Sequence, residues 1–509
     1  MITPRVGSLA ALIAGACLAL AFPPFGYWPL AAVGVALLTA TCRGQRLRTG
    51  ALMGLLAGLV QFGVLIRWLA VVGLDAWLLL TAYSALWIAL VGLATTAVTR
   101  LRGWPVWVAA VWVGQEALRD RVPLGGWPWG RLAFSQADAP WLPVAWWGGT
   151  ALLTFLVALT GALALWAVVT IRMRPAMAGA AGVAVLLLPV ALSQVAVSPS
   201  AVGDTTVAVV QGDVPATGLG FATEGQRREV LDNHVRQTIE LAGAVGRGEV
   251  SQPDFVIWPE NSSDLDPYTA RDAAAAISAA ARAIGVPILV GAVVTNPDDP
   301  DQVLNVSIVW DPVTGPGARY VKQHPVPFGE YVPFRDVLTR VIGRFDLVPR
   351  DFAPGDMPGV LPIAGVDVGA VICFEVAYDE VVRGTVLAGG QLLAVQTNNA
   401  TYTDGGQSEQ QLAMARIRAV EFGRATVVAA TNGISAQFLA DGTTLGLLPE
   451  RSAGFLVADL PIIDELSVAA RVGAWPELAA GLVALLTLIV GWRRPAKPLN
   501  RLAATVTQQ

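Results

Sequence analysis

Three short segments of the sequence carry residue types that together could form a covalent catalytic site. Glu260 ends the segment VIWPE, Lys322 lies in YVKQH, and Cys373 lies in ICFE. Each segment contains an apolar, β-prone run, and functional side chains tend to gather where loops leave a rigid sheet. A cysteine thiolate attacks carbonyl carbons well, but it needs a neighbouring base or cation to form at neutral pH. Glu260 could be that base, and Lys322 could stabilise the oxyanion of a tetrahedral intermediate.

Each of these three residues also has an ordinary structural interpretation. A free cysteine in a strand is most often a small buried hydrophobe. Glu260 could be a solvated loop carboxylate, and Lys322 could be a surface lysine. The order Glu, Lys, Cys with these neighbours is nevertheless specific, and it favours Cys373 as a nucleophile at a strand-to-helix turn. Three cysteines and two histidines in the whole chain predict neither a disulfide framework nor a metal site, and no cofactor is expected.

Apolar segments long enough to cross a bilayer dominate the first part of the chain. Hydrophobic residues make up 54% of the sequence and charged residues 14%, whereas soluble domains are about a quarter charged. A spanning helix needs about 20 mostly apolar residues. We predict a bundle of seven helices within residues 1–198, an eighth helix at 474–492 and a cytoplasmic tail at 498–509. The seven helices are expected near residues 7–22, 27–41, 50–72, 76–98, 104–118, 143–171 and 177–197.

The basic residues between these segments predict the orientation of the bundle. They fall on one side of the membrane if all eight segments span it, and the positive-inside rule makes that side the cytoplasm. Both termini are then cytoplasmic, and the polar region that follows the seventh helix lies outside. The loop 119–142 is the one basic loop on the outer side. Residues 1–21 also fit a cleavable signal peptide, but we favour a retained helix because further spans follow at once. The basic residues are Arg5, Arg43, Arg46, Arg48, Arg100, Arg102, Arg172, Arg174, Arg493, Arg494, Lys497 and Arg501.

Residues 204–463 alternate strand-like and helix-like runs, which predicts a layered α/β domain outside the cytoplasm. The strand-like runs are nearly all apolar, as expected for strands that are covered on both faces. These runs are residues 205–211, 254–258, 286–294, 304–310, 368–374, 392–396, 425–430 and 454–460. Helices are predicted at residues 224–245, 270–284 and 409–422. The net charge of −4 gives no basic surface for nucleic acid.

The three segments resemble the carbon–nitrogen hydrolase (nitrilase) superfamily, whose members use Glu, Lys and Cys. The fuller motifs WPE, YVKQHPVPFGEYVPF and ICFE resemble one branch of it, the apolipoprotein N-acyltransferase family. PLGGWPW at 123–129, TNNATY at 397–402 and QLAMARIRA at 411–419 extend the resemblance over nearly the whole chain. The resemblance implies a multi-pass α-helical membrane bundle plus an α/β nitrilase-like αββα sandwich domain. The family often has Trp-Phe at Thr401-Tyr402 and Tyr at Phe374, which could alter substrate contacts.

The resemblance also implies roles for individual residues. Glu260 is then the general base, Lys322 the oxyanion stabiliser, Cys373 the nucleophile and Glu330 a second active-site carboxylate that positions the lysine. Further active-site contacts are expected from Glu375 and Asn305, and candidates for walls of the substrate pocket are Trp258, Phe328 and Phe374.

The activity that the resemblance implies is transfer of a fatty acyl chain in two steps. The acyl chain moves from a membrane phospholipid to Cys373 and then to the N-terminal amine of a diacylglyceryl-cysteine lipoprotein. Burial of each CH₂ is worth about 0.8 kcal/mol. A site at the membrane therefore avoids the cost of extracting the acyl chains of both substrates from the bilayer. The protein is expected in the bacterial inner membrane, as a monomer.

Three other interpretations remain open from the residues alone. A membrane-anchored amidase of the nitrilase type would explain the three reactive residues, but it would need only one span. A transporter with an outer binding domain usually carries charges inside its helices, and here Arg67, Asp75 and Glu116 lie near predicted helix ends. A catalytically inactive scaffold would tolerate loss of Cys373.

We also predict that the apolar stretch Val332–Val348 gates the site.

Overall fold

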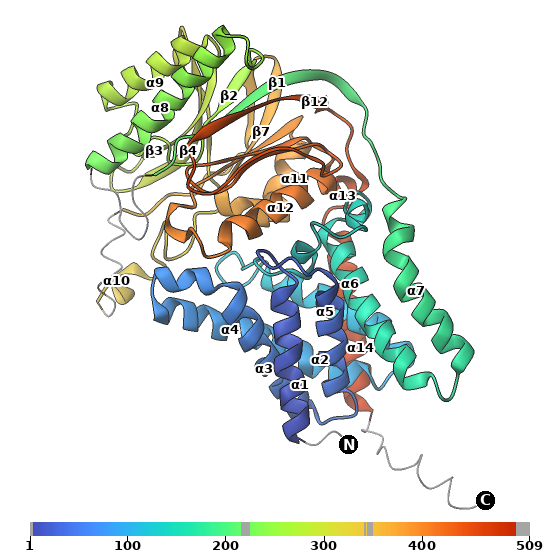
Figure 1. Cartoon of the computed structure of the whole chain (residues 1–509). Coiled ribbons are helices and arrows are strands. Elements are labelled where there is room, and N and C mark those ends of the chain that lie inside the picture. The colour runs from blue at the N-terminus through green and yellow to red at the C-terminus, as the bar shows by residue number, and fades with distance from the viewer. Residues whose placement is uncertain (1–3, 215–223, 341–342, 344–349, 495–509) are drawn as a thin grey trace, which may run out of the picture. The chain divides into compact units, whose positions relative to one another are not determined.

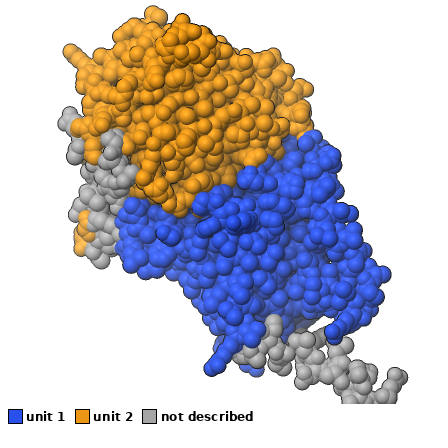
Figure 2. Space-filling view, in the orientation of Figure 1, with its two compact units in different colours: residues 1–196, 472–509 blue, residues 197–471 orange. Residues whose placement is uncertain are grey.

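The computed structural model describes residues 4–214, 224–340, 343 and 350–494. The chain divides into a helical unit, residues 1–196 and 472–509, and a polar unit, residues 197–471 (Figure 2). Each unit has its own core and is described by itself. The predicted tail at 498–509 lies outside the described residues, as does most of the C-terminal half of the proposed gate at 332–348.

The helical unit contains the apolar segments of the sequence as helices. Of the helices described, α3, α4, α6, α7 and α14 are long and apolar enough to cross a membrane, whereas α1 and α2 are shorter apolar helices. This agrees with the predicted multi-pass bundle. The helices are α1 (Pro4–Leu20), α2 (Pro29–Cys42), α3 (Leu47–Leu65), α4 (Leu74–Val98), α5 (Trp104–Arg119), α6 (Ala145–Thr170), α7 (Pro175–Ser193) and α14 (Trp475–Arg493).

Small residues let α3 and α4 approach each other closely. Gly50, Gly54 and Gly58 are spaced four residues apart on α3, so they share one face of the helix. A Cβ atom on Gly54 would overlap the carbonyl oxygen of Ile88, and one on Gly50 would overlap the hydroxyl of Thr96. Helices in lipid gain most from such close packing, because no hydrophobic effect drives their association there.

A buried ion network joins α5, the loop after it and α14. The guanidinium of Arg131 lies 2.5 Å from Glu477 and 3.2 Å from Asp120, and Arg131 is 2% exposed. Glu116 accepts hydrogen bonds from the backbone N–H of Leu132 at 2.7 Å and from the hydroxyl of Thr154 at 2.7 Å. Opposite charges therefore hold this loop against two helices that lie far apart in the sequence.

The polar unit contains two six-stranded mixed sheets. The first has the order β12-β1-β2-β3-β4-β5 and the second β11-β10-β9-β8-β7-β6. The β1–β2–β3 strands are parallel, as are β7–β8–β9. The first sheet comprises β1 (Ala201–Gln211), β2 (Phe255–Ile257), β3 (Ile288–Thr295), β4 (Val303–Asp311), β5 (Gly315–Val321) and β12 (Gly454–Ile463). The second comprises β6 (Val360–Ile363), β7 (Val366–Ile372), β8 (Leu392–Thr397), β9 (Thr426–Ala430), β10 (Ser435–Phe438) and β11 (Thr444–Leu448).

The two sheets pack face to face, and helices cover their outer faces. One core cluster joins residues of both sheets, among them Phe255 and Leu289 from the first and Val368 and Leu392 from the second. Helices α8 (Glu224–Gly246) and α9 (Arg271–Ile284) cover the first sheet, and α11 (Asp379–Leu387) and α12 (Gln407–Phe422) cover the second (Figure 1). This is the αββα sandwich that the family resemblance implied. The described residues also form the short helices α10 (Arg335–Leu338) and α13 (Val468–Val472), and α13 lies at the boundary between the two units.

The sequence expectations differ from the structure in several places. The predicted strand at 368–374 ends at Ile372, and a 3-10 helix, η5 (Cys373–Ala377), follows it. The apolar run continues through Cys373 and Phe374, so the sequence did not reveal where β7 stops pairing with β8. Strands β5, β6, β10 and β11 and helix α11 were not predicted. β5 and β11 are largely exposed, and β6 and β10 are only four residues long, so neither pair presents a long apolar run.

Candidate active site

Cys373 lies directly after β7, where the chain turns into η5. Its φ angle is +54°, in the left-handed region that residues with a side chain seldom adopt. Backbone strain of this kind concentrates at functional sites, because the surrounding structure must hold the residue in place. The turn places Cys373 at the carboxyl end of a parallel strand, with its side chain partly exposed.

Glu375 fixes this turn to the end of β5. Its buried carboxylate accepts hydrogen bonds from the backbone N–H of Ile372 at 2.8 Å and from that of Gln323 at 2.6 Å. The hydroxyl of Tyr320 donates to the same carboxylate at 2.9 Å. Burial raises the pKa of Glu375, whereas the charge of Lys322 and these donors lower it. Glu375 thus holds together the two segments that carry Cys373 and Lys322.

Lys322 is buried between two carboxylates. Its Nζ atom lies 3.1 Å from Oε1 of Glu260 and 3.0 Å from Oε1 of Glu330. The side-chain amide of Asn305 donates to the same two oxygens, at 2.7 Å and 2.9 Å. Burial alone would lower the pKa of Lys322, but the negative charges of Glu260 and Glu330 outweigh it and raise that pKa well above its ordinary value. Lys322 therefore keeps its positive charge.

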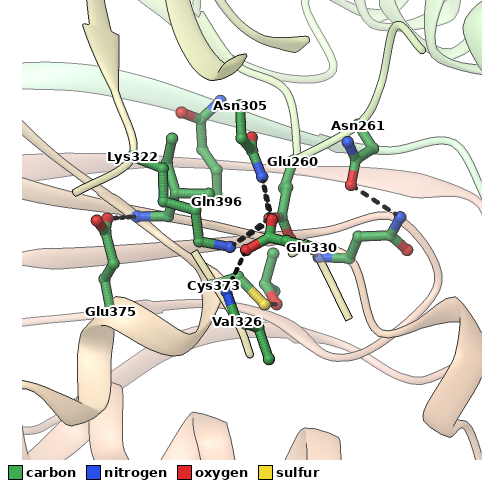
Figure 3. Close-up of polar contacts among 12 residues, drawn as sticks. Glu260, Asn261, Asn305, Lys322, Val326, Glu330, Cys373, Glu375 and Gln396 are labelled. Atoms are coloured by element: carbon green, nitrogen blue, oxygen red, sulfur yellow. Dashed lines mark hydrogen bonds and ion pairs between the residues drawn. The ribbon is translucent and has the colours of Figure 1, made fainter. Parts of the chain in front are cut away.

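The two carboxylates are themselves held by backbone donors. Glu260 follows β2, and its Oε2 atom accepts a hydrogen bond from the N–H of Asn398 at 2.9 Å. The Oε2 atom of Glu330 accepts one from the N–H of Val326 at 2.7 Å. Figure 3 shows Glu260, Glu330 and Cys373 converging from separate segments of the chain. Each carboxylate thus keeps a fixed orientation toward the lysine.

The surroundings of Cys373 favour its neutral thiol. Burial and the negative charge of Glu260 raise the pKa of Cys373 to about 12, although Lys322 and Thr397 lower it. A nucleophile in this state needs a base that takes its proton as it attacks. Glu260 offers a carboxylate that could accept this proton, and Lys322 offers a fixed positive charge. The arrangement can therefore perform nucleophilic attack on an acyl carbon with stabilisation of the resulting oxyanion.

The structure places the predicted pocket residues in different environments. Trp258 is fully buried in the core beneath α8, and its indole N–H donates to the hydroxyl of Thr238 at 2.9 Å. Phe374 is 8% exposed and contacts Tyr378 edge to face. Phe328 is 46% exposed, on the segment that carries Glu330. Phe328 is thus the most accessible of these three aromatic candidates.

Three polar residues next to Glu260 and Cys373 were not predicted. Asn398 contacts Glu260, and Thr397 and Gln411 contact the Cys373 thiol. All three lie in segments that the family resemblance had singled out, TNNATY and QLAMARIRA, but no spacing rule connected them to Cys373.

Among the residues that the structure describes, no cluster of His, Cys, Asp and Glu side chains is arranged to hold a metal ion.

Comparison with known proteins agrees with this architecture. The profile of the apolipoprotein N-acyltransferase N-terminal domain matches residues 14–163, and that of the carbon–nitrogen hydrolases matches residues 206–465. An apolipoprotein N-acyltransferase of Mycolicibacterium smegmatis is 40% identical over 98% of this chain and 88% of its own length. One of Azotobacter vinelandii is 30% identical over 96% and 94%. A solved amidase from Nesterenkonia sp. is 20% identical over 56% of this chain and 100% of its own, with a TM-score of 0.38. The chain belongs to the apolipoprotein N-acyltransferase family.

Proposed function

We propose that this protein transfers a fatty acyl chain from a membrane phospholipid to the N-terminal amine of a diacylglyceryl-cysteine lipoprotein, through an acyl-thioester on Cys373. The observation that carries the proposal is the convergence of Glu260, Lys322 and Cys373 in a chain of this family. The names of the relatives support a lipid donor and a lipoprotein acceptor.

In the first half-reaction, Glu260 takes the proton of the Cys373 thiol as Sγ attacks the ester carbon of the phospholipid. Lys322 stabilises the oxyanion that forms, because its positive charge is buried and held by two carboxylates. The tetrahedral intermediate then collapses, and the glycerol oxygen leaves with the proton that Glu260 returns. A lysophospholipid departs, and the acyl chain remains on sulfur.

In the second half-reaction, the amine of the lipoprotein attacks the thioester carbon. Glu260 accepts the amine proton, and Lys322 again stabilises the oxyanion. Collapse of the intermediate forms the amide and releases the Cys373 thiolate, which recovers its proton from Glu260. Dividing the transfer into two steps lets one site serve two large lipid substrates in turn.

We propose that the reaction takes place outside the cytoplasm. The distribution of arginine and lysine supports cytoplasmic termini and a polar unit on the outer side of the inner membrane. We also propose the domain limits that the apolar segments predicted, with a helix bundle at 1–198, the polar domain at 204–463, a last helix at 474–492 and a tail at 498–509. We further propose that the enzyme acts as a monomer. Attachment of a cysteine-reactive membrane-impermeant label to single cysteines introduced on the polar unit of intact spheroplasts tests the orientation.

Intact mass spectrometry tests the chemistry. The purified protein is incubated with phospholipid, and a Cys373→Ala variant and a Cys42→Ala variant are treated in parallel. Cys42 is buried in the helical unit, so its removal controls for nonspecific acylation of cysteine. We expect an acyl-sized, hydroxylamine-labile adduct on the parent and on Cys42→Ala, and none on Cys373→Ala.

The acceptor is tested by adding a diacylglyceryl-cysteine peptide to the acylated protein. Loss of the adduct together with acylation of the peptide amine supports the transfer. An intact, folded protein that forms no adduct from phospholipid but hydrolyses small amides would instead support a membrane-anchored amidase. An adduct that persists on Cys373→Ala would show that another residue is the nucleophile.

A further inference from the structure

A second group of polar side chains surrounds the Cys373 thiol, apart from Glu260 and Lys322. The hydroxyl of Thr397 lies 3.4 Å from Sγ, and the side-chain nitrogen of Gln411 lies 3.7 Å from it. Thr397 is 1% exposed and Gln411 2% exposed. Both groups can donate to sulfur, which accepts weakly as a thiol and more strongly once it is charged.

The strand register places Thr397 beside Cys373. The parallel strands β7 and β8 pair Ile372 with Gln396. The residues that follow this pair, Cys373 and Thr397, therefore come to the same edge of the sheet, where β7 has ended. Thr397 is still part of β8, so its position depends on the sheet and not on a flexible loop.

A buried amide fixes the orientation of Gln411. The side-chain nitrogen of Asn399 donates to Oε1 of Gln411 at 2.7 Å, and it also donates to Oε1 of Gln407 at 2.5 Å. With its oxygen accepting from Asn399, the amide of Gln411 directs its nitrogen toward Sγ. The hydroxyl of Thr397 lies 2.9 Å from the same oxygen of Gln411.

The single proton of the Thr397 hydroxyl has two acceptors within reach. When Cys373 is a thiol, the hydroxyl can donate to Gln411 and accept from S–H. When Cys373 is a thiolate, the hydroxyl can rotate and donate to sulfur, which is then the stronger acceptor. The nitrogen of Gln411 donates to sulfur in either state. The pair can therefore respond to the charge on Sγ without movement of the backbone.

We propose that Thr397 and Gln411 form a thiolate-stabilising donor pair at Cys373, on which release of the thiolate from the acyl-enzyme depends. The inference rests on the proposed role of Cys373 as the nucleophile. When the amine has attacked and its proton has passed to Glu260, the C=O bond re-forms as the C–S bond breaks. The electron pair of that bond leaves on Sγ, and the two donors stabilise it until Glu260 returns the proton.

Alkylation of Cys373 by iodoacetamide tests the donor pair without any lipid substrate. The full-length protein is alkylated across a range of pH, and the Cys373 peptide is quantified by mass spectrometry. In Thr397→Val, loss of one hydrogen bond to a charged group should raise the thiol pKa by about one unit. The more basic thiolate is also more nucleophilic, so we expect alkylation near neutral pH to slow by about threefold. Thr397→Ser keeps the hydroxyl and should react at the parental rate.

Thr385→Val is the matched control. Thr385 is fully buried in the same unit, and within the described part of the chain its hydroxyl has no hydrogen-bond partner. Its replacement removes a hydroxyl of the same kind without touching Cys373, so the alkylation profile should not change. A parallel slowing in Thr385→Val would show that the effect in Thr397→Val is merely structural, and it would overturn the proposal.

Gln411→Glu provides an independent test, should Thr397→Val fail to fold. The carboxylate keeps an acceptor for Asn399 and replaces the nitrogen that faces sulfur with a negatively charged oxygen. We expect slower alkylation than in Thr397→Val. Parental alkylation rates in folded Gln411→Glu would contradict the donor pair.

A preformed thioester on Cys373 reports on thiolate release itself. After addition of the acceptor peptide, its decay should be about tenfold slower in Thr397→Val than in the parent and should recover in Thr397→Ser. Decay at the parental rate in Thr397→Val would overturn the role in release. Absence of a thioester on the parent protein would instead reject the proposed function, and alkylation would still decide whether the two donors stabilise the thiolate.

Discussion

The Nζ atom of Lys322 lies 3.0 Å from Oε1 of Glu330, on a carboxylate that comes from eight residues further along the chain. The same lysine contacts Glu260, so one buried ammonium group is shared by two buried or partly buried carboxylates. We propose different functions for the two carboxylates. Glu260 accepts the proton of the nucleophile in the proposed reaction, whereas Glu330 only holds the lysine in place.

Neutralising the two carboxylates should therefore have unequal effects. Glu330→Gln removes a charge-assisted contact to Lys322, and we expect thioester formation to slow by about tenfold to a hundredfold. Glu260→Gln also removes the proposed base, and we expect thioester formation to slow by about 10²-fold to 10⁴-fold. Single-turnover acylation from phospholipid measures both. The control is Glu240→Gln, on the exposed face of α8, and equal losses in both active-site variants would contradict the division of roles.

The turn that carries Cys373 is held from beneath by Arg418. This arginine is fully buried on α12 and donates to the carbonyl oxygens of Val376 at 2.8 Å and Ala377 at 2.9 Å. It also pairs with Glu421 and Asp379. Lysine cannot reproduce these several planar contacts. Arg418→Lys should therefore loosen η5 and misplace Cys373.

We expect Arg418→Lys to slow thioester formation by more than tenfold, because a small misplacement of reacting groups is costly. Arg416→Lys is the matched control, since Arg416 lies on the same helix and donates instead to the carbonyl of Gly442. Circular dichroism and thermal unfolding establish that both variants are folded. A folded Arg418→Lys variant with parental activity would show that η5 does not depend on this arginine.

His234 should make the polar unit sensitive to acid. Burial lowers the pKa of His234 to about 4, from an ordinary value of 6.5. Below pH 6.5 His234 is protonated in the unfolded chain, whereas in the folded protein it stays neutral until about pH 4. The free energy of unfolding therefore falls as the pH is lowered through this window. For a fully buried histidine the loss amounts to about 2 kcal/mol between pH 8 and pH 5.

Replacement of His234 by phenylalanine removes this titration. Burial raises the pKa of the Asp264 carboxyl to about 6, which acts in the opposite direction over part of the same range. The comparison is therefore the change in thermal unfolding between pH 8 and pH 5, in His234→Phe against the parent. We expect a smaller acid loss in the variant. His324→Phe is the control, because the side chain of His324 is partly exposed. If His324→Phe reduced the acid loss as much as His234→Phe does, the acid sensitivity could not be assigned to His234.

The stability of the helical unit should depend more on Arg131 than on Glu477. Glu477→Ala removes one of the carboxylates that face the buried guanidinium of Arg131, and we expect the free energy of unfolding to fall by about 3–5 kcal/mol. Arg131→Met leaves both Asp120 and Glu477 without this counter-charge, so we expect it to be less stable than Glu477→Ala. Thermal unfolding in detergent measures this, with exposed Arg67→Gln as the control. An Arg131→Met variant as stable as Glu477→Ala would contradict this dependence.

The sequence alone predicted the membrane helices and a layered α/β domain, because both depend on local patterns. Apolar segments of sufficient length became the helices α3, α4, α6, α7 and α14. Apolar β-runs separated by helical segments indicated the layers, and the motifs around Glu260, Lys322 and Cys373 carried the family resemblance that implied the αββα sandwich. These signals are carried by composition, spacing and neighbouring residues, all of which can be read along the chain.

The tertiary structure alone decided how the site is assembled. The family resemblance implied that Glu330 positions Lys322, but only the tertiary structure shows that Glu330 and Glu260 contact the same ammonium group, because the three residues come from separate segments of the chain. The same holds for Gln411, which reaches Cys373 from a helix 38 residues away because α12 packs on the second sheet. Trp258 belongs to a motif that resembles the family, yet packing places it in the core. Long-range packing, and not sequence proximity, determines which charges and donors meet at Cys373.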